Sequence, residues 1–568
     1  MKRLLLIVDL EGIAGVESLA QLIAGGAGYD TACSLLTDEV NAAVEGFIAA
    51  GYDEVLISDS HRGGAAGANV IESRLHRRAR LHAGWDAYDP ALFAEADAVA
   101  CIGMHARAGT SGFIAHTVGL HCEWRLDGRP LSETDIVIDL AAAAACPIVY
   151  VAGDDVLCAA LAGRVTTIET KTCGGLFSCR SRLPEEVRAR LQAAAALRAT
   201  LPTSSARTPL EIRFKSRWQA DIAVTLGARR SSLYGVTTVA DEFRHGYRQA
   251  AGMVEATAGP ILTAVRGTPG SDELLADVAE LIARPVVGID EECRPLVVGN
   301  VEETLAAFLR WTDTPSDFSR ALRALLLHMA EGWAPRVFAR LHLRPVLYEA
   351  VAALRSIPMR LAPDVRPFDG MSRIDAWYIL RERGLPCEPA DREELRQYIE
   401  HLHALEMHAH AWMLGEMAAT QGIDVRLAYP WRPYRQRSRL VDLYWLTHEF
   451  LFATHYMRLP LSVTGWESRI EELFMATPWL IEHGHVDLAA EVALCLQMVG
   501  EQASIRHRQL VEFLLSRQRE DGVLLDGSMG DAPEIMADHA TGLLFLVQAG
   551  AEEWNLKIGG RSAGAATP

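Results

Sequence analysis

The hydrophobic periodicity of the chain changes once, near residue 270, and this change constrains the fold more than any other feature. Before it, short apolar runs alternate with helix-like segments, which is typical of a sheet covered by helices. After it, apolar residues recur about every 3.6 positions, which predicts helices. The 568 residues therefore predict an α/β domain followed by an all-α domain.

Five apolar runs in the first region predict strands, and three longer segments predict helices. The runs are 4–8, 54–57, 98–102, 148–151 and 165–168, and the helical segments are 37–50, 131–145 and 184–197. Thr37, followed by two acidic residues, predicts the N-cap of the first helix. We expect a mixed or parallel sheet with a metal site at its strand ends, where sites form in open α/β folds.

A cluster of helix-breaking residues at 266–272 (RGTPGSD) predicts the domain boundary, which gives domains 1–268 and 271–556. Helical spacing in the second domain is clearest over 301–311, 318–331, 396–417, 440–453, 488–498 and 504–515. Its segment 510–522 resembles the repeat of α/α-toroid proteins, which implies helix pairs in a toroid-like arrangement. Residues 557–568 are rich in Gly, Ala and Ser and predict a disordered tail.

Charge and composition exclude several classes of protein. With 55 basic against 73 acidic residues, the net charge of −18 argues against nucleic acid as the main partner. The sequence has no run of 18 apolar residues, so we expect no membrane span. The apolar run after Met1-Lys2-Arg3 stops at Asp9, too short for a signal peptide. The ten cysteines form no CxxC pair, and we expect a cytoplasmic protein.

Side chains of the types that bind metals follow successive predicted strands. Asp9 and Glu11 end the first run, and residues two apart in an extended chain point the same way, so both carboxylates can face one cleft. The other candidates are His61, His105, His116 and Glu133. The carboxyl ends of parallel strands meet at one edge of a sheet, which predicts that these residues lie close together.

Two histidines and three carboxylates form a ligand set that suits zinc or another divalent first-row metal. One carboxylate could bridge two ions, since the ions of two-metal hydrolytic sites lie about 3.5–4 Å apart. Each residue alone is more often a polar loop residue than a ligand, so the hypothesis depends on their joint occurrence. Asp154 and Asp155 precede an apolar segment, and helix capping explains them more simply than metal binding.

Several short motifs recur in a fixed order: DLEG (9–12), LTDEVN (36–41), SDSH (58–61), GMHARAG (103–109), AHT (115–117), Glu133, VAGDD (151–155) and the Thr170-Lys171 step. In this order and spacing they resemble the D-aminopeptidase family of zinc metallopeptidases, of the DppA type, over about residues 1–265. The resemblance implies a peptide-bond hydrolase.

The resemblance also implies two zinc ions per subunit, with Asp9 bridging them. The residues at the family's ligand positions are Asp9, Glu11, His61, His105 and Glu133. His116 stands at the position of the catalytic histidine, and Lys171 is expected to bind substrate. Members of the family assemble into rings, so the resemblance implies a homo-oligomer. Four positions depart from the family's usual pattern without removing a ligand, and they bear on substrate choice: Ser132, Asp135, Val137 and Leu176.

The predicted function is therefore a zinc-dependent aminopeptidase that removes the N-terminal residue of a small peptide. One alternative is a dedicated biosynthetic peptidase whose helical domain binds a modified or carrier peptide. An alternative of another class is a non-catalytic binding or assembly protein that keeps zinc for stability. His116 argues against the last alternative, since a vestigial site would be free to lose a residue that binds no metal.

Overall fold

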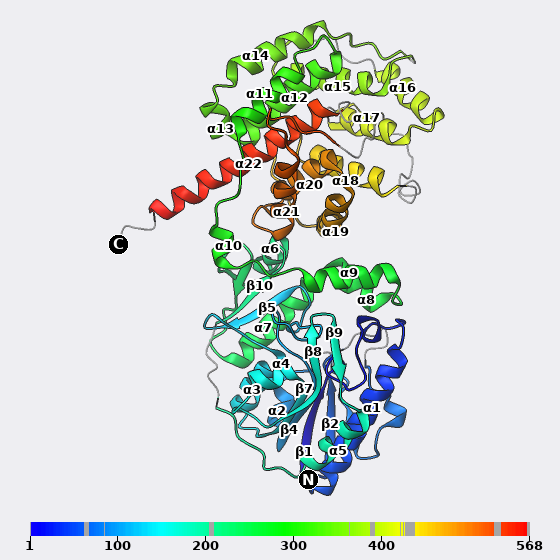
Figure 1. The fold of residues 1–568 in the computed structure, drawn as a ribbon, viewed down its shortest axis with the longest axis vertical. Helices are drawn as coiled ribbons and strands as arrows, with labels where there is room; N and C mark the ends of the chain where they lie inside the picture. Colours follow the sequence, from blue (N-terminus) through cyan, green and yellow to red (C-terminus); the bar gives the residue numbers. More distant parts are fainter. Residues whose placement is uncertain are drawn as a thin grey trace. The chain divides into compact units, whose positions relative to one another are not determined.

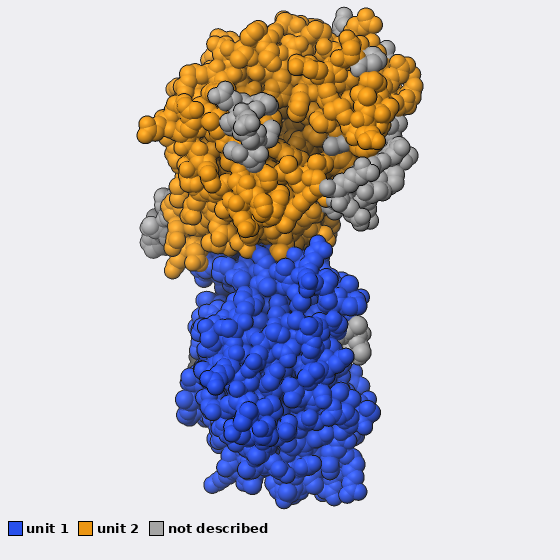
Figure 2. Space-filling model, turned by 45° about the vertical axis from the view of Figure 1, so that its right-hand side comes forward, with its two compact units in different colours: residues 1–289 blue, residues 290–568 orange. Residues whose placement is uncertain are grey.

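The computed structural model describes residues 2–61, 68–84, 86–203, 209–362, 364–386, 392–420, 422–423, 425, 438–526 and 536–564. The chain forms two compact units, residues Met1–Ile289 and Asp290–Pro568 (Figure 2). The first unit is α/β and the second is helical, as the periodicity predicts. No helix among the described residues is both long and apolar enough to cross a bilayer.

Unit 1 is built on a seven-stranded sheet with the order β3-β2-β1-β4-β7-β8-β9. Its strands are β1 (Arg3–Val8), β2 (Glu54–Asp59), β3 (Ala79–Leu81), β4 (Ala98–Met104), β7 (Ile148–Asp154), β8 (Thr167–Gly175) and β9 (Ser178–Ser181). All neighbours pair in parallel except β8 and β9, so the sheet is mixed. The central strands β4 and β7 are buried along their whole length, which explains their near-continuous apolar sequences.

Helices cover both faces of this sheet (Figure 1). On one face α1 (Tyr29–Ala49) packs against α5 (Pro184–Ala194), and on the other lie α2 (Pro90–Ala94) and α3 (Glu133–Ala143). The short helices η1 (Leu19–Leu22), η2 (Glu72–Arg74) and α4 (Asp155–Ala160) lie in the connections. The prediction that Thr37 caps a helix is wrong, because α1 begins eight residues earlier and the Thr37 hydroxyl donates to the carbonyl of Cys33 at 2.7 Å within it.

A second, antiparallel sheet was not predicted from the sequence. Its order is β11-β12-β10-β5-β6, and its strands are β5 (Cys122–Leu126), β6 (Arg129–Pro130), β10 (Leu210–Phe214), β11 (Arg229–Arg230) and β12 (Gly235–Thr237). α6 (Arg217–Thr225) and α7 (Phe243–Ala256) pack against it. The fully buried Trp124, Ile212 and Phe214 join this sheet to the core of the first.

Unit 1 includes α8 (Gly259–Gly267), which ends just before the predicted boundary, and continues past that boundary through α9 (Asp272–Ala283). Two buried cations of β10 and the residue after it hold this extension. Lys215 Nζ donates to the carbonyls of Leu281 and Ile282 at 2.6 and 3.0 Å, and Arg213 donates to that of Val287 at 2.6 Å. Because buried charges need such partners, the end of α9 is fixed to the second sheet.

All named elements of unit 2 are helices. They are α10 (Ile289–Cys293), α11 (Val301–Trp311), α12 (Asp317–Trp333), α13 (Pro335–Arg340), α14 (Arg344–Ala353), η3 (Leu354–Ser356), α15 (Pro367–Glu382), α16 (Arg392–Ala404), α17 (His408–Thr420), α18 (Arg439–Ala453), α19 (Glu467–His483), α20 (Val486–Met498), α21 (Ile505–Arg517) and α22 (Ala537–Gly564).

Two expectations for unit 2 differ in detail from the structure. The single helix predicted over 396–417 is two helices, because Glu406 takes a left-handed conformation (φ 58°) between α16 and α17. Residues 557–568 were predicted to form a disordered tail, but α22 extends into this segment and ends at Gly564. The last four residues of the chain lie outside the described part. The toroid-like arrangement stays a prediction.

Candidate metal centre

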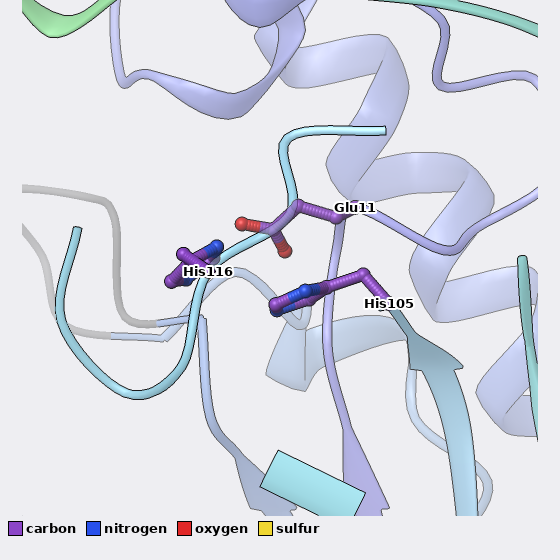
Figure 3. A group of neighbouring side chains, drawn as sticks. All are labelled: Glu11, His105 and His116. Carbon is purple, nitrogen blue, oxygen red and sulfur yellow. The ribbon is translucent and has the colours of Figure 1, made fainter. Parts of the chain in front are cut away.

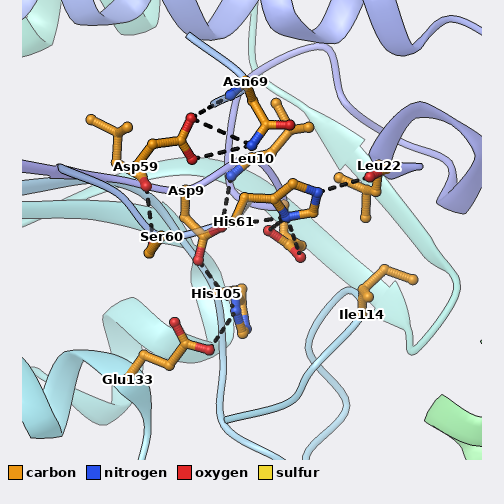
Figure 4. A network of polar contacts seen from close by, with 12 residues as sticks. Asp9, Leu10, Leu22, Asp59, Ser60, His61, Asn69, His105, Ile114 and Glu133 are labelled. Atoms are coloured by element: carbon orange, nitrogen blue, oxygen red, sulfur yellow. Dashed lines mark hydrogen bonds and ion pairs between the residues drawn. The ribbon is translucent and has the colours of Figure 1, made fainter. Parts of the chain in front are cut away.

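The predicted site residues converge at the carboxyl ends of three neighbouring strands (Figure 4). Asp9 and Glu11 follow β1, His61 follows β2, and His105 follows β4. β1 lies between β2 and β4, so the chain order reverses beside it. Such a switch point leaves a crevice at the strand ends, which is where open α/β sheets bind ligands.

Two glycines allow the Asp9–Glu11 loop to cross the end of β4. The amide of Gly12 donates to the carbonyl of Gly103 at 2.7 Å. A Cβ on Gly12 would lie 2.1 Å from the carbonyl oxygen of Met104, and one on Gly103 would lie 1.9 Å from that of Asp9. Gly103 also has a positive φ of 71°, which favours glycine. The D-L-E-G motif thus ends in glycine for a steric reason.

Lys171 stabilises this loop through hydrogen bonds to its backbone. Its buried ammonium group donates to the backbone carbonyls of Glu11 and Val16, and it lies 4.9 Å from the ring centre of Phe113. The prediction that Lys171 binds substrate therefore finds no support in its position, because the side chain is fully buried and does not line the neighbouring cavity. It fixes the loop that presents Asp9 and Glu11.

The six predicted residues form overlapping groups whose ligand atoms lie within 4.8 Å of one another. The groups are Asp9, Glu11 and His61; Asp9, His105 and Glu133; and Glu11, His105 and His116. In the first, His61 Nδ1 lies 3.0 Å from Glu11 and 3.6 Å from Asp9. In the second, His105 Nε2 lies 3.5 Å from Asp9 and 3.6 Å from Glu133. Asp9 is shared by these two groups, as a bridging carboxylate would be.

Each histidine uses one ring nitrogen to bind a backbone carbonyl and presents the other to the carboxylates. His61 Nε2 donates to Leu22 at 2.8 Å, His105 Nδ1 to Ala106 at 2.9 Å, and His116 Nδ1 to Ile114 at 2.8 Å. Such bonds fix the tautomer and the ring orientation of metal-binding histidines. The remaining nitrogen of each ring, when neutral, is a lone-pair donor aimed at the group of carboxylates.

The surroundings of His105 show whether these residues suit a cation. Its Nε2 atom is buried and has no hydrogen-bond partner among the described residues, although it faces the carboxylates of Asp9 and Glu133. A lone pair that faces two carboxylates is repelled unless a positive charge lies between them. The donor set, with imidazole nitrogen and carboxylate oxygen, is the one zinc prefers. The residues therefore fit a divalent metal.

Without a metal, protons on the histidines supply the positive charge. Burial would lower the pKa of His61, but Glu11 raises it to about 9, and Glu133 likewise raises the pKa of His105 to about 9. Burial and the charges of Glu11 and Glu133 raise the pKa of Asp9 well above its usual range. The histidines hold the pKa of Glu11 well below its usual range despite its burial.

Glu133 enters the site from the start of a helix rather than from the end of a strand. It is the first residue of α3, and its carboxylate accepts from the amide of Val118 at 2.7 Å and from the hydroxyl of Tyr88. Despite burial, His105 lowers its pKa to about 2. Ser132 and Asp135 form a capping box that starts the helix at Glu133. These two departures from the family pattern therefore position the carboxylate.

His116 lies against His105 with its free nitrogen toward the site (Figure 3). The two rings stack with centroids 4.2 Å apart, and His116 Nε2 lies 3.7 Å from Glu133. Burial and the charge of His105 lower its pKa, so the ring is neutral near pH 7. Ile114 and Val118, on either side, have positive φ values of 49° and 62°, an unfavourable conformation for branched residues that holds the loop around His116.

A cavity of about 200 Å³ opens beside these residues. Glu11, His61 and His116 line one wall of it. Most of the remaining lining is apolar and comes from η1, the loop after β4, and helices α7 to α9. A concave apolar pocket with a few convergent polar groups is the usual form of a small-ligand site.

Asp154, Asp155 and Cys173 form another group with metal-ligand spacing, but hydrogen bonds explain their arrangement. Asp154 accepts from the amides of Leu157 and Ala106, at 2.7 and 2.8 Å, and Asp155 accepts from that of Cys173 at 2.9 Å. Asp154 thus caps α4, as the sequence predicts, and holds the residue whose carbonyl orients His105.

Sequence reasoning missed the residues that orient the site. Tyr88, Leu22 and Val118 contact Glu133 or His61 but belong to connecting segments with no metal-binding pattern. Leu22 and Val118 act through backbone atoms, so no side-chain signal could have identified them. Tyr88 could have been suspected only from an aromatic hydroxyl in a loop between two predicted strands.

Two parts of the chain match known protein families. Residues 1–251 match the D-aminopeptidase family Peptidase_M55, and residues 330–545 match a domain family of unknown function, DUF6895. A D-aminopeptidase of Bacillus subtilis (strain 168) is 29% identical over 166 residues, which are 27% of this chain and 56% of that protein. The chain thus spans about half the length of this relative.

One solved structure is similar to the chain as well. It is described as the Zn-dependent D-aminopeptidase DppA from Bacillus subtilis, a self-compartmentalizing protease. The similarity covers 45% of this chain and 97% of that one, at 24% sequence identity and a TM-score of 0.41.

Proposed function

The N-terminal unit of this chain belongs to the D-aminopeptidase family, and from that premise we propose that the protein is a zinc-dependent aminopeptidase acting on small peptides. The observation that carries the proposal is the orientation of His61, His105 and His116. Each ring has one nitrogen fixed by a backbone carbonyl and the other turned toward buried carboxylates.

The residues that would hold two zinc ions divide into two sets that share Asp9. Glu11 and His61 would complete one set, and His105 and Glu133 the other. Bound zinc supplies a Lewis acid for the scissile carbonyl and lowers the pKa of water toward neutrality. The carboxylates balance that charge, and Tyr88 and Val118 hold Glu133 in place.

His116 is the residue we assign to proton transfer. Its Nδ1–H is engaged by Ile114, so only Nε2 is free to accept a proton or donate one. Because burial lowers the pKa of the ring and favours its neutral form, Nε2 can take the proton released by the attacking water and return it to the departing amine.

Substrate choice depends in part on a segment that lies beyond the family match. Leu262, Val265, Val278 and Ile282, from α8 and α9, line the cavity, whereas the match ends at residue 251. This favours a preference for an apolar residue next to the scissile bond. It also supports the second candidate, a dedicated peptidase with a narrower substrate than a general D-aminopeptidase. The homo-oligomer implied by the resemblance stays a prediction.

The proposed activity is tested by turnover of matched D- and L-aminoacyl amides with zinc-loaded protein and a chelator-treated control. We expect chelator-sensitive release of the N-terminal residue, with the D-series preferred. If protein that holds two zinc ions cleaves neither series, the dedicated peptidase replaces the general one. If it cleaves only the L-series, the stereochemical assignment is wrong.

Zinc affinity is expected to rise steeply with pH. His61 and His105, with pKa values of about 9 in the metal-free protein, are protonated at neutral pH, and zinc must displace both protons. Two displaced protons correspond to about a hundredfold tighter binding per pH unit between pH 6 and 8, and the slope disappears above about pH 9. Competition with a chelator of known pH dependence measures the slope, and a flat profile would contradict the proposed ligands.

A further inference from the structure

Unit 2 encloses a cavity of about 110 Å³ that is separate from the metal centre. Helices α12, α15, α17, α18, α20 and α22 contribute its lining. Most of the lining is apolar and includes Leu322, Leu325, Met329, Met417, Phe452 and Leu494. This volume approaches the roughly 150 Å³ of cavities that hold one aromatic ring.

Polar groups also line this cavity. They include Asp375 of α15, Thr447 and His448 of α18, Glu491 of α20 and His539 of α22. No lysine or arginine is among the described residues that line the cavity. The cavity therefore combines an apolar lining with carboxylates and with histidine as its only basic side chain.

One carboxylate of this region is already neutralised. Asp487, which is not among the lining residues, lies 2.7 Å from Nδ1 of His539 and accepts from the hydroxyl of Tyr444 at 2.9 Å. This contact raises the pKa of His539 to about 9, so Asp487 and His539 form an ion pair at neutral pH. His448 adds no positive charge, because burial lowers its pKa to about 4.

Two other carboxyl groups line the cavity, and the only positive charge among its described lining residues, on His539, is already paired with Asp487. Glu491 is 7% exposed, and Thr447 donates a hydrogen bond to one of its oxygens. Asp375 has a buried oxygen, Oδ1, with no hydrogen-bond partner among the described residues. Burial raises the pKa of Asp375 to about 7, and burial together with Asp487 raises that of Glu491 to about 8. Both groups would be stabilised by a positive charge inside the cavity.

We propose that this cavity binds a small organic amine, with its ammonium group between Asp375 and Glu491 and its alkyl chain or aromatic ring among the leucines and methionines. An ammonium group offers three donors, which suits two carboxylates that carry unused acceptor capacity. Hydrogen bonds between charged groups are the strong ones in a low-dielectric site. The apolar lining favours a hydrocarbon part of about six to eight carbon atoms.

A metal ion fits these residues less well, although Asp487, Glu491 and His539 lie within 4.8 Å of one another. In the metal centre of unit 1, a backbone carbonyl fixes the second nitrogen of each histidine. No backbone carbonyl among the described residues does so for His539. Most of the cavity lining is apolar, which suits a hydrocarbon better than a metal ion.

The test compares hexylamine and 2-phenylethylamine with the matched neutral alcohols, using calorimetry on the full-length protein. We expect the amines to bind and the alcohols to bind roughly tenfold more weakly or not at all, because a hydrogen bond to a charged group is worth about 1.5–3 kcal/mol. Glu491→Gln and Asp375→Asn, which keep the shape of the side chain, should each weaken amine binding by about tenfold or more. Glu482→Gln, an exposed acid on α19, is the matched control.

Other results would overturn the proposal. Equal affinity for amine and alcohol would mean an apolar cavity without charge recognition. Amine binding that neither Glu491→Gln nor Asp375→Asn weakens would place the ligand elsewhere, including in the metal centre. Zinc or manganese that remains bound when unit 1 has lost Asp9, and is released by Glu491→Gln, would mean a metal site. If both variants fail to fold, the comparison of amine with alcohol on the unaltered protein still tests whether the cavity recognises a positive charge. Peptide turnover in the same variants reports on unit 1 separately.

Discussion

Replacing Asp9 with asparagine is expected to remove zinc binding and peptide turnover together. Asp9 is the residue shared by the two proposed ligand sets, with oxygens 3.6 Å from His61 and 3.5 Å from His105. Asparagine keeps the size of the side chain but loses the charge and one of the two ligand oxygens. Partners that only orient ligands change metal affinity by about 10–100-fold, so loss of a bridging ligand should exceed about 100-fold.

The Asp9→Asn variant also has an expected effect on stability, of opposite sign with and without metal. In the metal-free protein the carboxylates of Glu11 and Glu133, together with burial, raise the pKa of Asp9 well above its usual range. Removing this carboxylate relieves that repulsion, so the metal-free variant should unfold at the same or a higher temperature. The zinc-dependent rise in melting temperature should disappear.

Metal content by elemental analysis, amide turnover and thermal unfolding measure these three effects. Asp38→Asn is the matched control, since Asp38 is an exposed acid on α1 that pairs with Arg74. If the Asp9 variant retained two zinc ions and most of its activity, Asp9 would not bridge the ions, and the assignment of all five ligands would need revision.

The sequence predicted the parts of unit 1 that depend on local pattern. β1, β4 and β7 are continuous apolar runs because both of their faces are buried, and such runs can be recognised without knowledge of the fold. Since the ligands sit where these strands end, locating the strands was enough to bring Asp9, His61 and His105 together. Their distances and orientations depend on loops, which the pattern does not specify.

The second sheet could not be predicted, because its strands are short and ordinary in composition. β5 (CEWRL) and β10 (LEIRF) alternate apolar and polar residues over only five positions and pair across more than 80 residues of chain. The same limit applies to α9, whose place in unit 1 depends on Lys215 and Arg213 reaching backbone carbonyls. Buried cations that bind carbonyls leave no periodic signal in a sequence.

The cavity of unit 2 illustrates this limit for a site. Asp487 and Glu491 are one helical turn apart on α20, but His539 lies about 50 residues later and Asp375 more than 100 residues earlier. Helical periodicity locates each helix and cannot say which faces meet.

Replacing His116 with alanine is expected to reduce turnover by about 10²–10⁴-fold while zinc remains bound, because this is the usual contribution of a positioned acid–base group. Zinc should remain bound because the proposed ligand sets do not include His116. Turnover should fall because Nε2 of this neutral ring, beside Glu133, is the atom assigned to proton transfer. Single-turnover kinetics and elemental analysis measure turnover and zinc content, and replacement of His245, an exposed histidine of α7, with alanine is the control.

Since an acid–base residue sets one limb of the pH–rate profile, the acidic limb should flatten in the His116 variant. Loss of zinc would instead make His116 a ligand, as its position near Glu11 and His105 would allow. Unchanged turnover with zinc retained would exclude a catalytic role, and turnover absent from both proteins would favour a binding protein that keeps zinc for stability.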